Sequence, residues 1–213
     1  MEAMEDAARG AFRPERLVFR PVEDNDQDKS FIHDAILSDP VSRAMGNPTL
    51  FVPVTKAASY TEIEAGMRSS LLGLLICLPG EDVNPDAADA GKHEGGKQGN
   101  LNLTPIGFLF LHKYAAHLRR TRISIQLARQ YQGVGYGTQA IRWALTWAFK
   151  WADLHRVEIS AASYNERAVK LYAKLGFTLE GRQREAVFMN GAWYDIVSFG
   201  MLRREWEAQV GHG

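Results

Sequence analysis

The sequence contains a single cysteine, Cys77, among its 213 residues. One cysteine excludes an internal disulfide and a thiolate metal cluster. The chain also has no excess charge, because 25 Lys and Arg residues balance 25 Asp and Glu residues. Nucleic-acid-binding proteins usually carry a basic excess, so this balance argues against such a partner. The longest apolar stretch, residues 71–78, is far too short to cross a bilayer and argues against a membrane protein.

The composition is that of an ordinary globular protein, with 46% hydrophobic and 23% charged residues. At about 150 residues per domain, the length favours one domain with an insertion. The first residues are acidic and lack the apolar run of a signal peptide, so we expect a soluble, cytoplasmic protein. We expect a flexible leader over residues 1–15, one domain over 16–205 and a tail over 206–213.

Apolar periodicity predicts a mixed α/β fold in which strands and helices alternate after residue 121. Strands are predicted over residues 16–22, 70–78, 106–114, 121–128, 157–162, 177–189 and 193–202, helices over 28–37, 55–67, 138–154 and 165–175, and a loop over 42–53. Residues 79–105 are rich in glycine, proline and charge, so we expect a mobile insertion in a hairpin. The dipeptide Asn190-Gly191 between two apolar runs predicts a second hairpin.

A glycine-rich turn, Gln-Gly-Val-Gly-Tyr-Gly-Thr over residues 132–138, lies between a predicted strand and the longest predicted helix. Glycine allows the backbone to approach a ligand closely, and a helix N-terminus favours phosphate oxygens. The spacing departs from the dinucleotide pattern Gly-x-Gly-x-x-Gly, because Thr138 stands at its third glycine, and no Walker A tripeptide exists. It fits Gln/Arg-x-x-Gly-x-Gly/Ala through Gln132, Gly135 and Gly137. A tight turn without any ligand is the alternative.

A second motif follows downstream, as Asn165-Glu-Arg-Ala-Val-Lys-Leu-Tyr172-Ala-Lys-Leu-Gly-Phe177 and then a segment from Glu180 to Asp195. With the turn, it resembles the GNAT (N-acetyltransferase) superfamily, most closely the branch of RimJ/RimL-type ribosomal-protein acetyltransferases and spermidine acetyltransferases. The close match covers about residues 104–202. The resemblance implies a single domain with a mixed, splayed central sheet flanked by helices.

The resemblance also implies acetyl-CoA as co-substrate. The strand end at Leu127 and Ala128 would pair with the pantetheine arm, and Asn165 would contact the coenzyme, although it is equally a good helix N-cap. The diphosphate would meet the backbone amides of the turn, namely Gln132, Gly133, Val134, Gly135, Tyr136, Gly137 and Thr138. We expect no metal, since no cluster of His, Asp and Glu has ligand spacing.

Tyr172 matches the family tyrosine that protonates the departing CoA sulfur. Its position on the apolar face of its helix is also compatible with simple core packing. Many family members place a glutamate on the strand before the turn, but Ser124 and Gln126 stand there in this chain. The general base would then have to be a water relay or another side chain, such as His112, Glu185 or Asp195. Without a catalytic role, His112 would be a structural histidine and the two carboxylates would be solvated surface charges. We therefore assign no general base.

The function expected from these motifs is acetyl-CoA-dependent acetylation of a primary amine by direct attack in a ternary complex. The acceptor, a small molecule or a peptide amine, is left open, and a homodimer is compatible with the sequence. A non-catalytic acyl-CoA-binding regulatory module is the alternative, motivated by the missing strand carboxylate. A dinucleotide-dependent redox protein is a third, weaker interpretation that the glycine spacing opposes.

Overall fold

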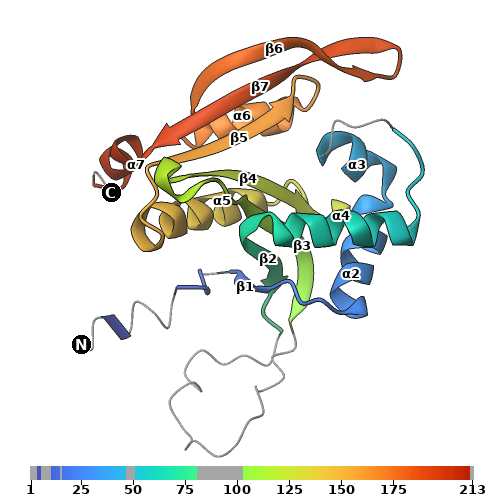
Figure 1. The fold of residues 1–213 in the computed structure, drawn as a ribbon, viewed down its shortest axis with the longest axis horizontal. Helices are drawn as coiled ribbons and strands as arrows, with labels where there is room; N and C mark the ends of the chain where they lie inside the picture. The colour runs from blue at the N-terminus through green and yellow to red at the C-terminus, as the bar shows by residue number, and fades with distance from the viewer. Residues whose placement is uncertain (1–3, 6–10, 15, 47–50, 81–102, 212–213) are drawn as a thin grey trace, which may run out of the picture.

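A seven-stranded sheet in the order β1-β2-β3-β4-β5-β7-β6 organises the protein (Figure 1). The computed structural model describes residues 4–5, 11–14, 16–46, 51–80 and 103–211. The strands are β1 Val18–Pro21, β2 Ser70–Leu78, β3 Thr104–His112, β4 Arg120–Leu127, β5 Arg156–Ala162, β6 Thr178–Met189 and β7 Ala192–Leu202. The helices are α2 Asp26–Ile32, η1 His33–Leu37, α3 Pro40–Gly46, α4 Lys56–Arg68, η3 Ala116–Leu118, η4 Arg129–Tyr131, α5 Tyr136–Thr146, η5 Trp147–Trp151, α6 Glu166–Lys174 and α7 Arg203–Val210.

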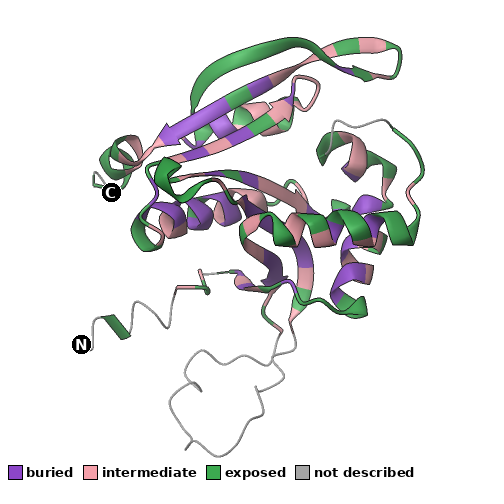
Figure 2. Ribbon diagram, viewed as in Figure 1, coloured by how far each residue is buried: buried purple, intermediate pink, exposed green. Residues whose placement is uncertain are grey.

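The central strands are apolar without interruption because both of their faces are buried. Leu74 and Ile76 of β2 point into a core that contains α5, whereas Leu75 and Cys77 point into a second core on the opposite face, beneath α2 and α4. In Figure 2 the buried residues concentrate in the middle of the sheet and on α5, and the outer strand β6 is exposed along most of its length. The apolar runs that predicted strands therefore reflect helices on both sides.

All neighbouring strands are antiparallel except β4 and β5, which are parallel. This pair is joined at only three positions, where Arg120, Thr121 and Arg122 lie opposite Arg156, Val157 and Glu158. Beyond those positions the two strands part toward the side on which α3 lies (Figure 1). The mixed, splayed sheet implied by the family resemblance is thus confirmed.

Local chemistry explains why the predicted hairpins formed. At the β6–β7 turn, Asn190 and Gly191 both have positive φ, 48° and 80°, which is the two-residue turn that this dipeptide favours. Strands β2 and β3 pair in antiparallel register, as predicted. Most of the predicted insertion between them, residues 81–102, lies outside the described residues.

One segment differs from the sequence-based expectation, and two segments near the ends of the chain contact the domain. Helix α3 covers Pro40–Gly46, so the loop predicted from residue 42 was wrong there. Residues from 206 onward, expected to be a tail, begin within α7, where the Trp206 ring lies 5.5 Å from that of Phe149. In the expected leader, the described Phe12 ring lies 5.7 Å from Trp143, whose indole N–H donates to the carbonyl of Ala11.

Candidate functional site

The glycine-rich turn connects β4 to α5 with its backbone open to a ligand. Gly133 and Gly135 have φ of +83° and +99°, values that side chains rarely allow, and a Cβ at either position would meet nothing within 4 Å. The amide of Gln139 donates to the carbonyl of Gly135 at 3.2 Å and starts the α5 ladder. The amides ahead of it have no partner within the helix, so they and the positive end of the helix dipole form an anion-binding arrangement.

The side chain of Gln132 fixes the shape of this turn. Its Nε2 donates to the carbonyl of Leu127 at 2.8 Å, and its Oε1 accepts from Nη2 of Arg167 on α6 at 2.5 Å. The turn is thereby held to the end of β4 and to the following α/β unit. The Arg167 guanidinium also adds positive charge beside the amides, which would favour a diphosphate.

The parting of β4 and β5 leaves one edge of β4 without a strand partner in its second half. Residues 123–127 pair with β3 on one side, and β5 no longer pairs with them on the other. A strand edge of this kind offers alternating N–H and C=O groups to an extended ligand. Open backbone is therefore found on either side of η4, in the second half of β4 and in the turn from Gly133 onward. Between them, the amides of Tyr131 and Gln132 donate to the carbonyls of Ala128 and Arg129.

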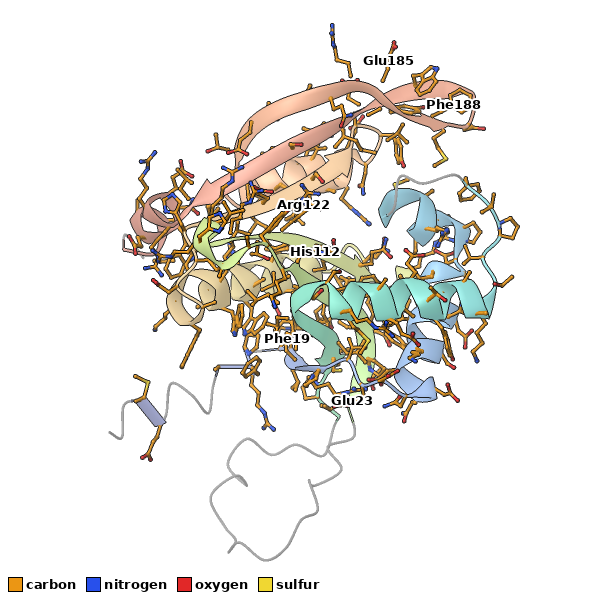
Figure 3. All side chains as sticks on the ribbon, viewed as in Figure 1. Phe19, Glu23, His112, Arg122, Glu185 and Phe188 are labelled. Atoms are coloured by element: carbon orange, nitrogen blue, oxygen red, sulfur yellow. The ribbon has the colours of Figure 1, made fainter. Side chains whose placement is uncertain are left out.

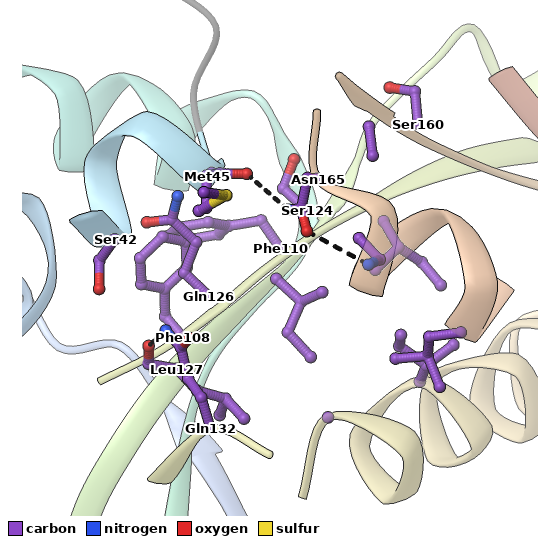
Figure 4. A pocket seen from close by; sticks show the side chains of 18 of the residues that line it. Ser42, Met45, Phe108, Phe110, Ser124, Gln126, Leu127, Gln132, Ser160 and Asn165 are labelled. Carbon is purple, nitrogen blue, oxygen red and sulfur yellow. Dashed lines mark hydrogen bonds between the residues drawn. The ribbon is translucent and has the colours of Figure 1, made fainter. Parts of the chain in front are cut away.

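A cavity of about 830 Å³ occupies the opening between β4 and β5. Figure 4 shows side chains from α3, β3, β4 and α6 around it, including Met45, Phe110, Ser124 and Asn165. Among the predicted site residues, its lining contains Leu127, Gln132, Gly133, Gly135, Gly137, Thr138, Asn165 and Tyr172. The side chains of Ala128, Val134 and Tyr136 point elsewhere: Ala128 is buried in the second core, Val134 is exposed, and Tyr136 lies beneath Arg16.

Tyr172 lies on α6 and reaches the cavity from within the core. Its ring packs edge-on against Phe199 at 5.8 Å and against Phe177 at 6.3 Å, and only 8% of the residue is exposed. Burial raises the pKa of Tyr172 to about 12, so the phenol is protonated at neutral pH. Core packing and a position in the cavity are therefore combined in this one residue.

Asn165 caps α6 and also connects α6 to α3 by a hydrogen bond. Its Oδ1 accepts from the amide of Ala168 at 3.2 Å, and its Nδ2 donates to the carbonyl of Met45 on α3 at 3.0 Å (Figure 4). The hydroxyl of Tyr164 donates to the carbonyl of Ala44 at 2.6 Å. These two bonds hold α3 across the cavity from α6.

His112 and Ser124 form a hydrogen-bonded pair in the cavity lining. Nε2 of His112 lies 2.7 Å from Oγ of Ser124, and both residues line the cavity. Burial, with a smaller contribution from the Arg122 guanidinium, lowers the pKa of His112, so the imidazole is neutral at pH 7. The alternation along β3 could have revealed this placement, because residue 112 shares a strand face with Phe108 and Phe110.

Glu185 and Asp195, the other groups considered as bases, lie apart from this cavity. They line a separate open pocket on the β6–β7 hairpin with Arg182 and Arg184, and Figure 3 shows Glu185 on that arm, away from His112. Oδ1 of Asp195 accepts from the amide of Glu185 at 3.1 Å and helps hold an irregular stretch of β6. The Asp195 carboxylate thus stabilises the hairpin, and neither carboxylate lines the cavity.

Neither a metal cluster nor a membrane-spanning helix is found in the described part of the chain. No three His, Cys, Asp or Glu side chains there gather closely enough to bind a metal ion. None of the described helices has the length and apolar character needed to cross a bilayer.

The family model of the acetyltransferase (GNAT) domain matches residues 16–178. The chain belongs to the GNAT family. The N-acetyltransferase resemblance drawn from the two motifs is thus confirmed. The match begins before β1 and ends at the start of β6, so it includes the turn, the parted strands and Tyr172.

Curated relatives agree with this assignment. The chain is 35% identical over 103 residues to YdaF of Bacillus subtilis, provisionally named a ribosomal N-acetyltransferase, a match of 48% of this chain and 56% of that protein. It is 27% identical over 116 residues to the spermidine N(1)-acetyltransferase of Escherichia coli K12, a match of 54% of this chain and 58% of that enzyme. The chain spans about half the length of the curated relatives it matches.

Solved structures share the fold at lower identity. The spermidine N-acetyltransferase of Vibrio cholerae, crystallised in complex with CoA and spermine, superposes with a TM-score of 0.69 at 21% identity, covering 91% of this chain and 99% of that one. A GNAT-family acetyltransferase from Bacillus anthracis gives 0.68 at 20% identity, covering 91% and 98%. At these identities the likeness concerns the fold.

Proposed function

We propose that the protein is an acetyl-CoA-dependent N-acetyltransferase that acts on a primary amine by direct attack in a ternary complex. One observation carries the proposal: a single cavity contains the anion-binding turn, the open edge of β4, a buried phenol and a neutral imidazole. Donor and acceptor could then meet in one space. Direct transfer needs no covalent enzyme intermediate and gains its rate from such positioning.

The residues present fit acetyl-CoA. The amides from Gly133 to Thr138 would hold the diphosphate, with Arg167 beside them, and the edge of β4 would pair with the pantetheine amides. The amide of Gln132, also expected there, already donates to the carbonyl of Arg129 at 3.2 Å, so Gln132 would contribute by shaping the turn. Gly133 and Gly135 leave room for that approach. The bound thioester supplies an acetyl group activated for attack by nitrogen.

His112 is our choice for the group that receives the ammonium proton. A free amine has a pKa of roughly 10 and enters mostly protonated, so it must lose a proton before it can attack. His112 is neutral, faces the cavity and is oriented by Ser124 at 2.7 Å. The proton would pass to the imidazole directly or through water, and then to solvent. The dyad supplies the base that the strand glutamate provides in other family members.

Tyr172 would donate a hydrogen bond to the sulfur as the bond to carbon breaks. Its phenol is protonated and held in place by Phe177 and Phe199. The nitrogen loses two protons in the reaction. The first passes to His112 before the attack and then to solvent, and the second passes from the tetrahedral adduct to the same imidazole, directly or through water. The sulfur leaves as a thiolate that accepts a hydrogen bond from Tyr172 and then takes a proton from solvent. Each proton thus has a stated route.

Two measurements test the proposal. Mass spectrometry of an amine panel incubated with acetyl-CoA should show products heavier by one acetyl group. Calorimetry should show that CoA binds more tightly than pantetheine, which lacks the diphosphate. Tight CoA binding without any acetylated product would instead favour the regulatory acyl-CoA-binding module. Equal affinity for CoA and pantetheine would contradict the role of the turn.

A homo-oligomer is proposed from the exposed hairpin. Among the described strands, β6 lies at an edge of the sheet. Near its tip the rings of Phe188 and Trp193 lie 5.2 Å apart in a tilted arrangement, and these residues are 56% and 59% exposed. Sedimentation should therefore give a mass above 23.8 kDa.

The cytoplasmic location remains a prediction that cell fractionation tests.

A further inference from the structure

The acceptor end of the cavity differs in character from the coenzyme end. Elements of the first half of the chain form most of it, and its walls are mainly apolar: Ile32, Leu37, Ile63, Phe108 and Phe110 all line it and are at most 8% exposed. Ser42 and Gln126 add one hydroxyl and one amide, both uncharged, to the same lining. The Phe108 and Phe110 rings lie 5.2 Å apart on one face of β3. Such walls match the body of an apolar ligand.

Charge in the cavity lining is sparse and not acidic overall. Among the described lining residues, Glu62 is the one carboxylate, and Arg122 and Arg167 are guanidinium groups. Glu62 lies 3.6 Å from Nη1 of Arg43, which offsets its charge. A ligand with several ammonium groups would need a carboxylate for each one that it buries, since an unpaired charge loses its hydration without compensation.

From these walls and charges we infer that the acceptor is a primary monoamine with an apolar, ring-sized body, and that polyamines are rejected. This inference rests on the proposed function and adds the class of acceptor to it. The single ammonium group would lie toward His112 and Ser124, where its proton is removed, and the apolar body would lie against Phe108 and Phe110. A free arylalkylamine and the N-terminus of a peptide with an aromatic first residue share this chemistry.

The lining also offers a site at which the preference can be changed. Met45 lies at the C-terminal end of α3, lines the cavity and is 40% exposed, so a polar side chain there need not be buried. Met45→Glu adds a carboxylate to the mouth of the cavity. Met45→Gln has nearly the same shape without the charge and is the matched control.

The test compares 2-phenylethylamine, ethylamine, spermidine and a tripeptide with N-terminal phenylalanine as acceptors. One methylene in an apolar pocket changes specificity by roughly 10–200-fold, so kcat/KM should fall at least about 100-fold from 2-phenylethylamine to ethylamine. We expect a similar loss, about 100-fold or more, for spermidine. Met45→Glu should raise the ratio of kcat/KM for spermidine to kcat/KM for 2-phenylethylamine by about tenfold. Met45→Gln should leave this ratio near the wild-type value. The tripeptide distinguishes a peptide acceptor from a free amine.

Calorimetric titration of the same amines into CoA-loaded protein gives a second readout that does not require turnover. Tighter binding of 2-phenylethylamine than of spermidine supports the inference even if acetylation is not detected, in which case only the proposed activity fails. Spermidine that binds or reacts as well as 2-phenylethylamine would overturn the inference while leaving the acetyltransferase activity intact. Failure of every amine to bind would overturn it too.

Discussion

Replacing Tyr172 by phenylalanine removes one hydroxyl from the cavity and leaves the surrounding packing in place. The ring contacts Phe177 and Phe199, and burial of the residue is nearly complete, so phenylalanine should keep the same position. Within the described residues no hydrogen bond to the hydroxyl is found that its removal would break. We therefore expect the melting temperature and the affinity for CoA to be unchanged.

The size of the effect follows from the two acids involved. Burial raises the pKa of Tyr172 to about 12, whereas an ordinary thiol has a pKa of about 8.5. The phenol is thus the weaker acid, and its contribution is a hydrogen bond to developing negative charge rather than early release of its proton. A positioned acid contributes about 100- to 10,000-fold, and we expect a loss of kcat at the lower end, about 100-fold at pH 7.5.

The assay is steady-state thiol release at saturating acetyl-CoA and amine, together with calorimetry of CoA. Tyr194→Phe is the matched control, because Tyr194 lies on β7 outside the cavity lining and its kcat should stay at the wild-type value. A Tyr172→Phe protein whose kcat is within about twofold of wild type would refute the catalytic role. It would leave Tyr172 as a core aromatic residue.

Three further predictions concern the base, the turn and the fold. His112→Gln should abolish the plateau of kcat/KM above the lowered pKa of the imidazole, and the rate should instead rise until the amine itself ionises near pH 10; an unchanged profile would exclude His112 as the base. Gly135→Ala should weaken CoA binding about tenfold and leave pantetheine binding unchanged, because φ of +99° strains any side chain. Gly181→Ala is the control, because a Cβ there would lie in open space at an ordinary φ. An equal loss of CoA affinity in both variants would contradict the role of the turn. Asp28→Asn should cost about 2–3 kcal/mol in urea unfolding at pH 7, since it breaks the two bonds that Arg20 donates to a carboxylate whose side chain is 3% exposed. Burial raises the pKa of Asp28, but the bonds from Arg20 and the Glu23 amide outweigh burial, so the net pKa lies below its ordinary value. This stability should therefore be present above about pH 4 and decline as the pH falls through the folded-state pKa; a difference that does not shrink at all as the pH falls below about 4 would argue against this origin.

The parts of the site that were predictable from the sequence are those fixed by local chemistry. The turn from Gln132 to Thr138 needs positive φ at Gly133 and Gly135 and a helix start directly after them, and all three requirements appear in consecutive residues. The Asn190-Gly191 hairpin is predictable for the same reason. Such features depend on a few dihedral angles and not on distant packing.

Helix α3 was not predicted from the sequence, which favoured a helix over residues 28–37 and a loop from residue 42. Pro40 is the first residue of α3, where a missing N–H costs nothing, and Oδ2 of Asp39 accepts from the amide of Ser42 at 2.8 Å. The dipeptide Asp39-Pro40 was thus an available start signal. The bonds that hold the helix over the cavity come from Tyr164 and Asn165, both 120 residues later in the sequence, and no local pattern reports them.

The proposed role of His112 depends on the structure for a related reason. As a single residue at the end of an apolar strand, it was more readily interpreted as structural than as functional. Its partner Ser124 was noted only because it stands where many family members place a glutamate on the next strand. The pairing of β3 with β4 brings Phe110 opposite Ser124, and the same face of the sheet then carries His112 within 2.7 Å of the serine hydroxyl. The dyad becomes visible only when strand register is known.

The parted strands also explain why the motifs identify the donor and not the acceptor. The turn and α6, which carry most residues of the two motifs, lie on the β4-to-β7 side of the cavity, where the proposed coenzyme would present the same chemistry in every family member. The opposite wall comes from α2, η1, α3, α4 and β3, whose side chains need only be compatible with one another and with a variable amine. Because α3 is tied to α6 through the backbone carbonyls of Ala44 and Met45, the side chains on that wall can change without disturbing the junction. Acceptor specificity must therefore be argued from the lining itself, and on the inference above a mainly apolar, weakly charged wall would select against a polycation however strongly the turn resembles that of a polyamine acetyltransferase.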